Sequence, residues 1–309
     1  IARAASGRDK IAICGYHGWH DWYLAANLNN DGDDSLDGHL LPGLEISGVP
    51  KNLRGTVFPF HYNNFDELES LVKREEIGVI KMEVIRNEGP EDNFLKKVRD
   101  LADQHSIVLI FDECTSGFRE TFGGIHKKYE VEPDIAMFGK ALGNGYALTA
   151  VLGKKEVMES AQSSFISSTF WTERIGPSAA LKTLEIMQRE RSWEKITKSG
   201  LTIRNGIQSL ADKYNLDIKN WGILALTGYT FSSKFSSEYK TLVTQEMLKK
   251  GYLAANSTYV ATSHTPELIG GYLEALDSVF ALIKECEDGR DINSLLESDV
   301  CHTGFRRLN

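Results

Sequence analysis

Short apolar runs alternate with amphipathic stretches up to about residue 155, and this alternation limits the possible folds more than any other feature of the chain. The β-branched runs predict strands over residues 10–14, 78–84, 107–113, 134–138 and 148–152. Between two of these runs, apolar residues fall on one helical face, namely Phe94, Leu95, Val98, Leu101 and Ala102. The alternation predicts an α/β fold in which helices cover a mostly parallel sheet.

The pattern changes after Pro177. The sequence then predicts two long helices, two weaker strands and a final helix, at residues 177–190, 192–214, 228–235, 252–263 and from Pro266 onward. A chain of 309 residues is long enough for one large domain and a smaller companion. We therefore expect a large domain over residues 1–190 and a smaller C-terminal α+β domain over residues 191–309.

Composition narrows the possible partners. A formal net charge of −8 without a long basic cluster argues against nucleic-acid binding, because phosphates require a positive face. No apolar run reaches the roughly 18 residues that a membrane-spanning helix needs, so we expect no membrane span. The cysteines contain no CxxC pair, which is typical of a reducing cytoplasm; they are Cys14, Cys114, Cys286 and Cys301.

Two neighbouring predicted strands end in chemically useful groups. The run Ile107–Phe111 is followed directly by Asp112, and the run that ends at Phe138 is followed by Gly139 and Lys140. Carboxyl ends of parallel strands meet at one edge of a sheet, where open α/β sheets bind ligands. Taken alone, the acid could simply cap a turn and the lysine could be a solvated surface residue. Their shared edge favours a binding site.

The stretch "CGYHGWHD", residues 14–21, places two glycines, several flat rings and a carboxylate directly after an apolar run. Pyridoxal 5'-phosphate (PLP) is the cofactor that combines a flat-ring platform with a buried carboxylate and a lysine. Its aldehyde forms a Schiff base with a lysine, its ring nitrogen requires a carboxylate, and its ring lies between flat or branched side chains. The combination of this stretch with Asp112 and Lys140 predicts PLP as the cofactor.

Several motifs together resemble the class III, fold-type I, PLP-dependent aminotransferases, in particular the branch of glutamate-1-semialdehyde 2,1-aminomutase. They are "CGYHGWHD", "VIKMEVIRNEG" (79–89), "LIFDECTSGFR" (109–119), "MFGKALGNGYALTAVLG" (137–153) and "YLAANSTYVATSHT" (252–265). The resemblance implies a transferase that acts on a small-molecule amino donor and a carbonyl acceptor. It also implies a homodimer.

Position by position, the resemblance implies that Lys140 is the Schiff-base lysine, which also moves a proton once a substrate amine displaces it. Asp112 is then the partner of the pyridine nitrogen. Removing this acid should lower turnover more than it weakens binding, because the protonated ring withdraws electrons from the substrate.

The resemblance also assigns the clamp around the cofactor ring. Tyr16 stacks on one face, Gly15 allows a close approach, and His17 lies beside the ring. Cys114 meets the opposite face, where the family usually has valine, and a cysteine can act there as a small hydrophobe.

Two further positions are assigned where this sequence departs from the family pattern. Glu83 matches the acid near the cofactor and substrate, but Val84 replaces the usual proline after it. Thr169 matches the threonine that reaches the phosphate of the neighbouring subunit's cofactor, and Thr172 is its rival because the usual Gly-Asn-Pro is missing.

Several alternatives stay open. Family members carry a phosphate-binding turn and a dimer-forming segment upstream of this sequence, so we expect a fragment or an incomplete gene model. A truncated, inactive fold that serves as a binding module is therefore one alternative, and an aminomutase is another. The stretch "ALGNGY" (141–146) is closer to general aminotransferases than the "IIGGG" of the mutase, which favours transamination.

Charged and imidazole groups elsewhere have plainer interpretations. A glycine between His17 and His20 makes a helical metal-ligand pair unfavourable, so no metal site is expected. The acidic stretch at residues 29–38 is interpreted as a solvated loop, since it lacks the ordered ligands of a calcium loop. Arg119 and Arg174 can bind a substrate carboxylate, although surface salt bridges are the plainer role.

Overall fold

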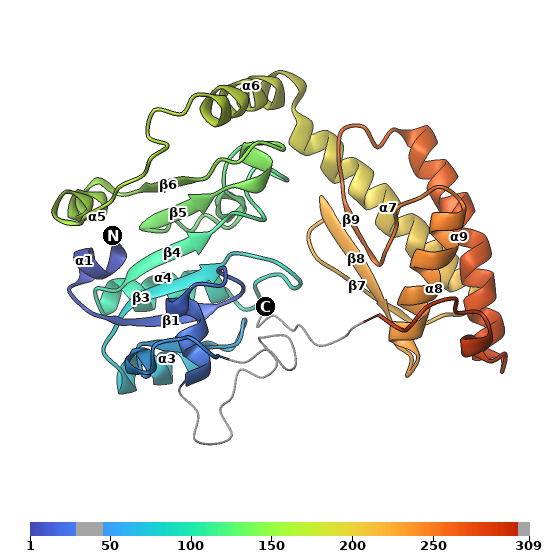
Figure 1. The fold of residues 1–309 in the computed structure, drawn as a ribbon, viewed down its shortest axis with the longest axis horizontal. Helices are drawn as coiled ribbons and strands as arrows, with labels where there is room; N and C mark the ends of the chain where they lie inside the picture. The colour runs from blue at the N-terminus through green and yellow to red at the C-terminus, as the bar shows by residue number, and fades with distance from the viewer. Residues whose placement is uncertain (29–45, 302–309) are drawn as a thin grey trace. The chain divides into compact units, whose positions relative to one another are not determined.

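The computed structural model describes residues 1–28 and 46–301 (Figure 1). The acidic stretch at residues 29–38 lies outside these residues. The chain divides into two compact units, with the boundary between Ile186 and Met187. Each unit is described by itself below.

A six-stranded sheet forms the centre of the first unit (Figure 1). Its order is β2-β1-β3-β4-β5-β6, and the strands are β1 (Lys10–Cys14), β2 (Val57–Pro59), β3 (Ile77–Glu83), β4 (Val108–Asp112), β5 (Ile135–Phe138) and β6 (Ala150–Gly153). All neighbours pair in parallel except β6, which runs antiparallel to β5 at the edge. The predicted mostly parallel sheet is confirmed, and the five predicted strands correspond to β1 and β3 to β6. Strand β2, which ends in a proline, was not predicted.

Helices and short 3-10 segments connect these strands. The α-helices of this unit are α1 (Ala2–Ser6), α2 (Asp21–Leu24), α3 (Phe65–Arg74), α4 (Phe94–Gln104), α5 (Lys155–Met158) and α6 (Ile175–Glu190), of which the last crosses the unit boundary. The 3-10 segments are η1 (Ala25–Leu28), η3 (Lys51–Leu53), η4 (Ile125–Tyr129), η5 (Lys140–Leu142) and η6 (Glu159–Ser163). The predicted apolar face of α4 is buried in full, because its residues recur at the helical period.

The central strands place their last residues at the same edge. All seven residues of β3 and all five of β4 are buried, as expected for strands covered on both faces. In the parallel register, Glu83 lies beside Asp112, and Asp112 lies beside Met137 of β5. Polar groups that end these strands or follow them therefore gather at one sheet edge.

The second unit packs helices on a small antiparallel sheet of order β7-β8-β9 (Figure 1). Its elements are α7 (Ser192–Tyr214), β7 (Ile218–Trp221), β8 (Leu226–Phe231), α8 (Ser236–Lys249), β9 (Ser257–Tyr259), α9 (Pro266–Glu287) and η7 (Ile292–Ser294). The predicted helices α7 and α9 are confirmed. The two predicted strands are shorter than expected, and β7 and α8 were not predicted.

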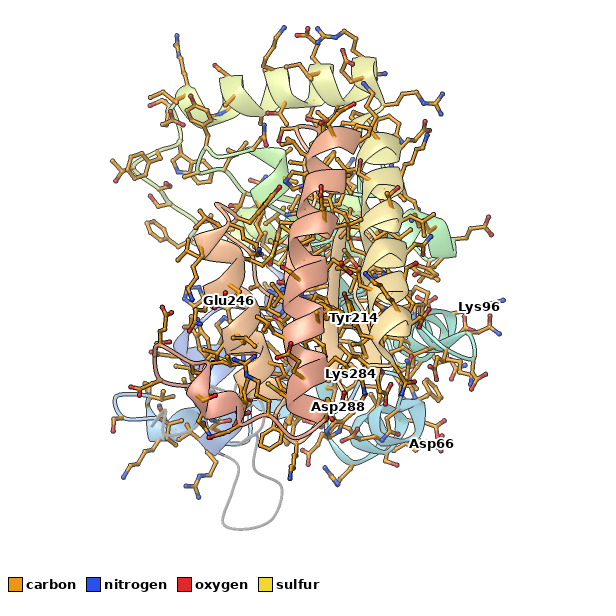
Figure 2. All side chains as sticks on the ribbon, turned by 90° about the vertical axis from the view of Figure 1, so that its right-hand side faces the viewer. Asp66, Lys96, Tyr214, Glu246, Lys284 and Asp288 are labelled. Carbon is orange, nitrogen blue, oxygen red and sulfur yellow. The ribbon has the colours of Figure 1, made fainter. Side chains whose placement is uncertain are left out.

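Local side-chain interactions stabilise both ends of helix α9. Thr265 caps the first turn by accepting a hydrogen bond from the N–H of Leu268, and Pro266 follows it. Figure 2 shows Lys284 and Asp288 at the other end of the helix, where Lys284 Nζ lies 2.7 Å from Asp288 Oδ1. A cation in the last turn also complements the helix dipole. Within the described part of the chain, every helix falls short of the length or the apolar content that a bilayer span requires.

Candidate active site

Asp112 is a buried carboxylate with three described donors. Its Oδ2 lies 2.9 Å from His17 Nδ1 and 3.2 Å from Lys81 Nζ, and its Oδ1 accepts the N–H of Cys114 at 3.2 Å. Burial alone would raise the pKa of Asp112, but the His17 hydrogen bond and the Lys81 charge outweigh burial and lower that pKa below its ordinary value. The carboxylate is therefore ionised at neutral pH.

His17 is buried and connects Asp112 to the end of β1. Its Nδ1 faces Asp112, and its Nε2 lies 3.1 Å from the carbonyl oxygen of Cys14. Both neighbours of the ring are hydrogen-bond acceptors, and each ring nitrogen lies within hydrogen-bond distance of one of them. His17 thus holds the side chain of Asp112 and the turn after β1 in one arrangement.

Lys140 follows β5 in a backbone conformation that is unusual for a residue with a side chain. Its φ is +45°, in the left-handed region. Its carbonyl oxygen accepts the N–H groups of Gly143 at 3.1 Å and Asn144 at 3.0 Å, which holds this turn. The side chain is exposed, and Nζ donates to Thr115 Oγ1 at 2.9 Å. Such local strain is characteristic of functional sites.

The loop after β1 carries Tyr16, which lies next to His17 in sequence. Its N–H donates to Glu83 Oε2 at 3.1 Å, and Tyr23 donates its hydroxyl to the carbonyl oxygen of Gly15 at 3.1 Å. Gly15 has a φ of +103°, a conformation that side chains rarely adopt, and this turns the loop back toward the sheet. The half-buried Tyr16 ring packs at 5.2 Å, centroid to centroid, from the Trp19 ring.

Cys114 is half-buried between Asp112 and the Gly139 backbone. Burial and the Asp112 charge raise the pKa of its thiol to about 12, so the thiol stays neutral and acts as a small apolar group. A Cβ on Gly139 would lie 3.5 Å from Cys114 Sγ and 3.4 Å from Thr149, which shows how closely the chain packs before Lys140.

The structure thus brings six of the predicted positions to one sheet edge or to the loop beside it. They come from the ends of β3 and β4 and from the loop after β1: Gly15, Tyr16, His17, Glu83, Asp112 and Cys114. Lys140 belongs to the same edge because it follows β5, the neighbour of β4. Thr169, in contrast, is exposed in the segment between η6 and α6.

Sequence analysis missed two residues that contact these groups. Lys81 is buried in the middle of β3 and pairs with Asp112, and Thr115 accepts the hydrogen bond from Lys140. The sequence did contain a signal for Lys81, namely a single cation in the apolar run "IGVIKM". It contained no signal for Thr115, because the role of Thr115 depends on where the chain turns after β4.

A second buried acid lies beside Asp112 in sequence but serves the following loop. Glu113 is fully buried and accepts from Ser116 Oγ at 2.5 Å, from the N–H of His126 at 3.0 Å and from His126 Nδ1 at 2.9 Å. Arg119 donates to the carbonyl oxygen of Thr115 at 2.6 Å, within the same loop. Across residues 1–28 and 46–301, no group of three or more His, Cys, Asp or Glu side chains has a metal-binding arrangement.

Comparison with known proteins identifies the family of the chain. The family model of class-III aminotransferases matches residues 2–269. The chain belongs to the class-III aminotransferase family. It is 31% identical to the 3-aminobutyryl-CoA aminotransferase of Cloacimonas acidaminovorans over 299 residues, which cover 92% of this chain and 68% of that protein. It is 30% identical to the glutamate-1-semialdehyde 2,1-aminomutase of Methanosphaera stadtmanae over 303 residues, which cover 90% of this chain and 69% of that protein.

Solved structures agree on the fold. The PLP internal aldimine form of the FumI protein of Sphingopyxis sp. MTA144 superposes with a TM-score of 0.80 at 22% identity, covering 96% of this chain and 70% of that one. An omega-transaminase from Sphaerobacter thermophilus gives a TM-score of 0.78 at 21% identity, covering 91% of this chain and 70% of that one. The predicted fold-type I architecture is confirmed.

The chain is therefore a PLP-dependent aminotransferase that uses small-molecule amino and carbonyl substrates. The predictions of family, enzyme class and cofactor are confirmed, and an inactive binding module is not favoured. The residues present fit PLP, because the exposed primary amine suits its aldehyde, the ionised acid suits its ring nitrogen and the flat ring suits its face, while the neutral Cys114 thiol acts as a small apolar group.

Proposed function

We propose that the protein moves an amino group from a donor to a separate carbonyl acceptor, with Lys140 and Asp112 as its catalytic residues. The proposal rests on the positions of Asp112 and Lys140 at two neighbouring strand ends and on the charge of Asp112. Asp112 ends β4, Lys140 follows the neighbouring strand β5, and the carboxylate is held ionised by His17 and Lys81. An exposed amine and a fixed anion at one sheet edge match the two ends of the PLP ring system.

Lys140 and Asp112 would have different roles toward the cofactor. When bound, PLP supplies an aldehyde that accepts amines and a ring that withdraws electrons from the substrate. Lys140 would hold the aldehyde carbon and, once a substrate amine displaces it, would carry a proton at Nζ. Asp112 would accept a hydrogen bond from the ring nitrogen with a lone pair that its three donors leave free.

Other residues would bound and orient the cofactor. Tyr16 and Cys114 would lie against its two faces, and Gly15 would let the backbone approach. Glu83 orients Tyr16 through its hydrogen bond to the Tyr16 N–H at 3.1 Å. His17 would act through Asp112, because its ring contacts the carboxylate at 2.9 Å.

Labelling of the lysines tests the assignment. The purified protein is incubated with PLP, reduced with borohydride and mapped by peptide mass spectrometry. We expect a single phosphopyridoxyl label on Lys140, which is lost in Lys140→Arg. Lys81 is an internal control, because it is the other lysine beside this edge and is paired with Asp112. A label on Lys81, or no label on Lys140, would refute the assignment.

An aminomutase is the second candidate, because relatives at 28–30% identity carry the name glutamate-1-semialdehyde 2,1-aminomutase. The two reactions differ in their need for a second substrate. With an amino donor alone, an aminotransferase stops after about one turnover per site, whereas a mutase converts its single substrate continuously. Sustained turnover of glutamate-1-semialdehyde without an acceptor would favour the mutase.

We also propose a homodimer whose interface includes the segment from residue 165 to residue 181. This segment exposes large apolar side chains to an extent that is unusual for a free surface, namely Phe165 at 99%, Phe170 at 73%, Trp171 at 66%, Ile175 at 68% and Leu181 at 71%. Thr169 is exposed among them, so a second copy that covers the segment would bring Thr169 toward the partner's cofactor phosphate.

Sedimentation tests this interface. We expect the wild type to sediment as a dimer at micromolar concentration and Trp171→Ser with Leu181→Ser to shift it toward the monomer. A monomeric wild type would overturn the proposal. We further propose a cytoplasmic location, which is supported by the spacing of the four cysteines, because the sequence contains no CxxC pair and no disulfide-dense pattern. Fractionation of the producing cells would check the location.

A further inference from the structure

Lys81 is a buried cation among apolar neighbours. It lies in the middle of β3, where its register partners are Ile13 of β1 and Ile110 of β4. Only 9% of its side chain is exposed. Its ammonium lies 3.2 Å from Asp112 Oδ2 and 5.4 Å from the centre of the Trp22 ring. The carboxylate and the ring face together replace the water that the ammonium has lost.

Stability accounts for only a small part of the preference for a lysine at this position. An apolar residue in place of one member of a buried ion pair is costly only when the other charge loses its last partner. Asp112 keeps His17 at 2.9 Å and the N–H of Cys114 at 3.2 Å without Lys81. An apolar side chain would also pack well between Ile13 and Ile110. The cation added to a carboxylate that already has two hydrogen-bond donors therefore points to a role at the site itself.

We propose that Lys81 is a positioning residue that weakens the hold of Asp112 on the protonated ring nitrogen of the cofactor. This inference rests on the assignment of Asp112 under the proposed function. The Lys81 ammonium and a protonated ring nitrogen share one carboxylate, and each like charge disfavours the charged form of the other. Lys81 thereby lowers the proton affinity of the ring nitrogen, by about tenfold when two like charges share one carboxylate.

A pair of cofactors isolates this effect from packing. PLP and its 1-deaza analogue share the aldehyde and the phosphate, but the analogue has a C–H group in place of the ring nitrogen and cannot bond to Asp112. The measured quantity is the ratio of the two dissociation constants, analogue over PLP, obtained by fluorescence titration of the apoprotein. We expect Lys81→Met to raise this ratio about tenfold, because PLP binding alone gains. We expect Lys81→Arg, which keeps the charge, to restore the wild-type ratio.

Lys154 offers a matched control outside the site. Its ammonium lies 2.7 Å from Asp134 Oδ1, and Asp134 Oδ2 also pairs with Arg99 at 3.0 Å, so this carboxylate keeps another partner when Lys154 is replaced. Lys154→Met should leave the ratio unchanged. Equal weakening of both cofactors in Lys81→Met, or a lower ratio, would overturn the inference and leave Lys81 a packing role only.

Two further results separate this inference from the proposed function. A ratio near one in the wild type would show that Asp112 does not bind the ring nitrogen, which would refute that assignment and the inference with it. A high wild-type ratio that does not change in Lys81→Met would refute the inference alone. If Lys81→Met fails to fold, Lys81→Gln keeps a hydrogen-bond donor without the charge, and the same rise in the ratio is expected.

Discussion

The substitution Asp112→Asn should destabilise the apoprotein by about 3 kcal/mol, a large effect for a nearly isosteric change. It removes the counter-ion of Lys81, whose side chain is only 9% exposed. Breaking a buried ion pair by removing one partner costs about 3–5 kcal/mol. The Trp22 ring, 5.4 Å from the ammonium, offsets on the order of 1 kcal/mol of this cost. We therefore expect a value at the lower end of the range.

A double-mutant cycle separates the ion pair from other effects of the substitution. Lys81→Met alone should cost about 1 kcal/mol, because Asp112 keeps its contact with His17. The double variant should cost about 2 kcal/mol, well below the sum of about 4 kcal/mol, since no buried ammonium is left without a counter-ion. The coupling energy of about 2 kcal/mol is within the range for residues in direct contact.

Urea unfolding followed by far-UV circular dichroism provides the assay, and only the transition of the first unit should shift. The exposed pair Lys73–Glu69 of α3 is the control, at 2.7 Å with both side chains at least 40% exposed. Its coupling energy should stay below about 1 kcal/mol. If the effects of Asp112→Asn and Lys81→Met simply add, the two side chains do not form a buried ion pair and the reasoning fails.

Three further predictions concern pH, chemistry and packing. Folding lowers the pKa of Asp112, so the ionised carboxylate stabilises the fold fully above the ordinary Asp range near pH 4, and this stabilisation is lost as the pH falls toward the folded-state pKa. Urea midpoints measured between pH 6 and pH 3 should therefore fall less steeply in Asp112→Asn than in the wild type. Lys140→Ala should lower turnover about a thousandfold or more, while circular dichroism stays unchanged because the side chain is exposed; unchanged turnover would disprove the assignment of this lysine. Cys114→Val should keep turnover within about threefold, because the neutral thiol acts as a small apolar group, and a larger loss in steady-state assays would show that the sulfur has its own role.

Local pattern alone determined the elements that position the site. Strands β3 and β4 are nearly continuous apolar runs, and such runs become strands that are buried on both faces. Because parallel strands end at a common edge, the positions of Asp112 and Lys140 at that edge also followed from the sequence. Strand β2 was not predicted, because a three-residue strand that ends in proline carries too little periodicity.

Only the tertiary structure decided which side chains meet at that edge. His17 and Asp112 are 95 residues apart in sequence, and they touch because β1 and β4 both flank β3. Lys81 reaches Asp112 for the same reason, since strand order and register determine which residues face one another across a sheet. A sequence pattern with a period of two or 3.6 residues reports which face a residue occupies, but it carries no information about the neighbour on the next strand.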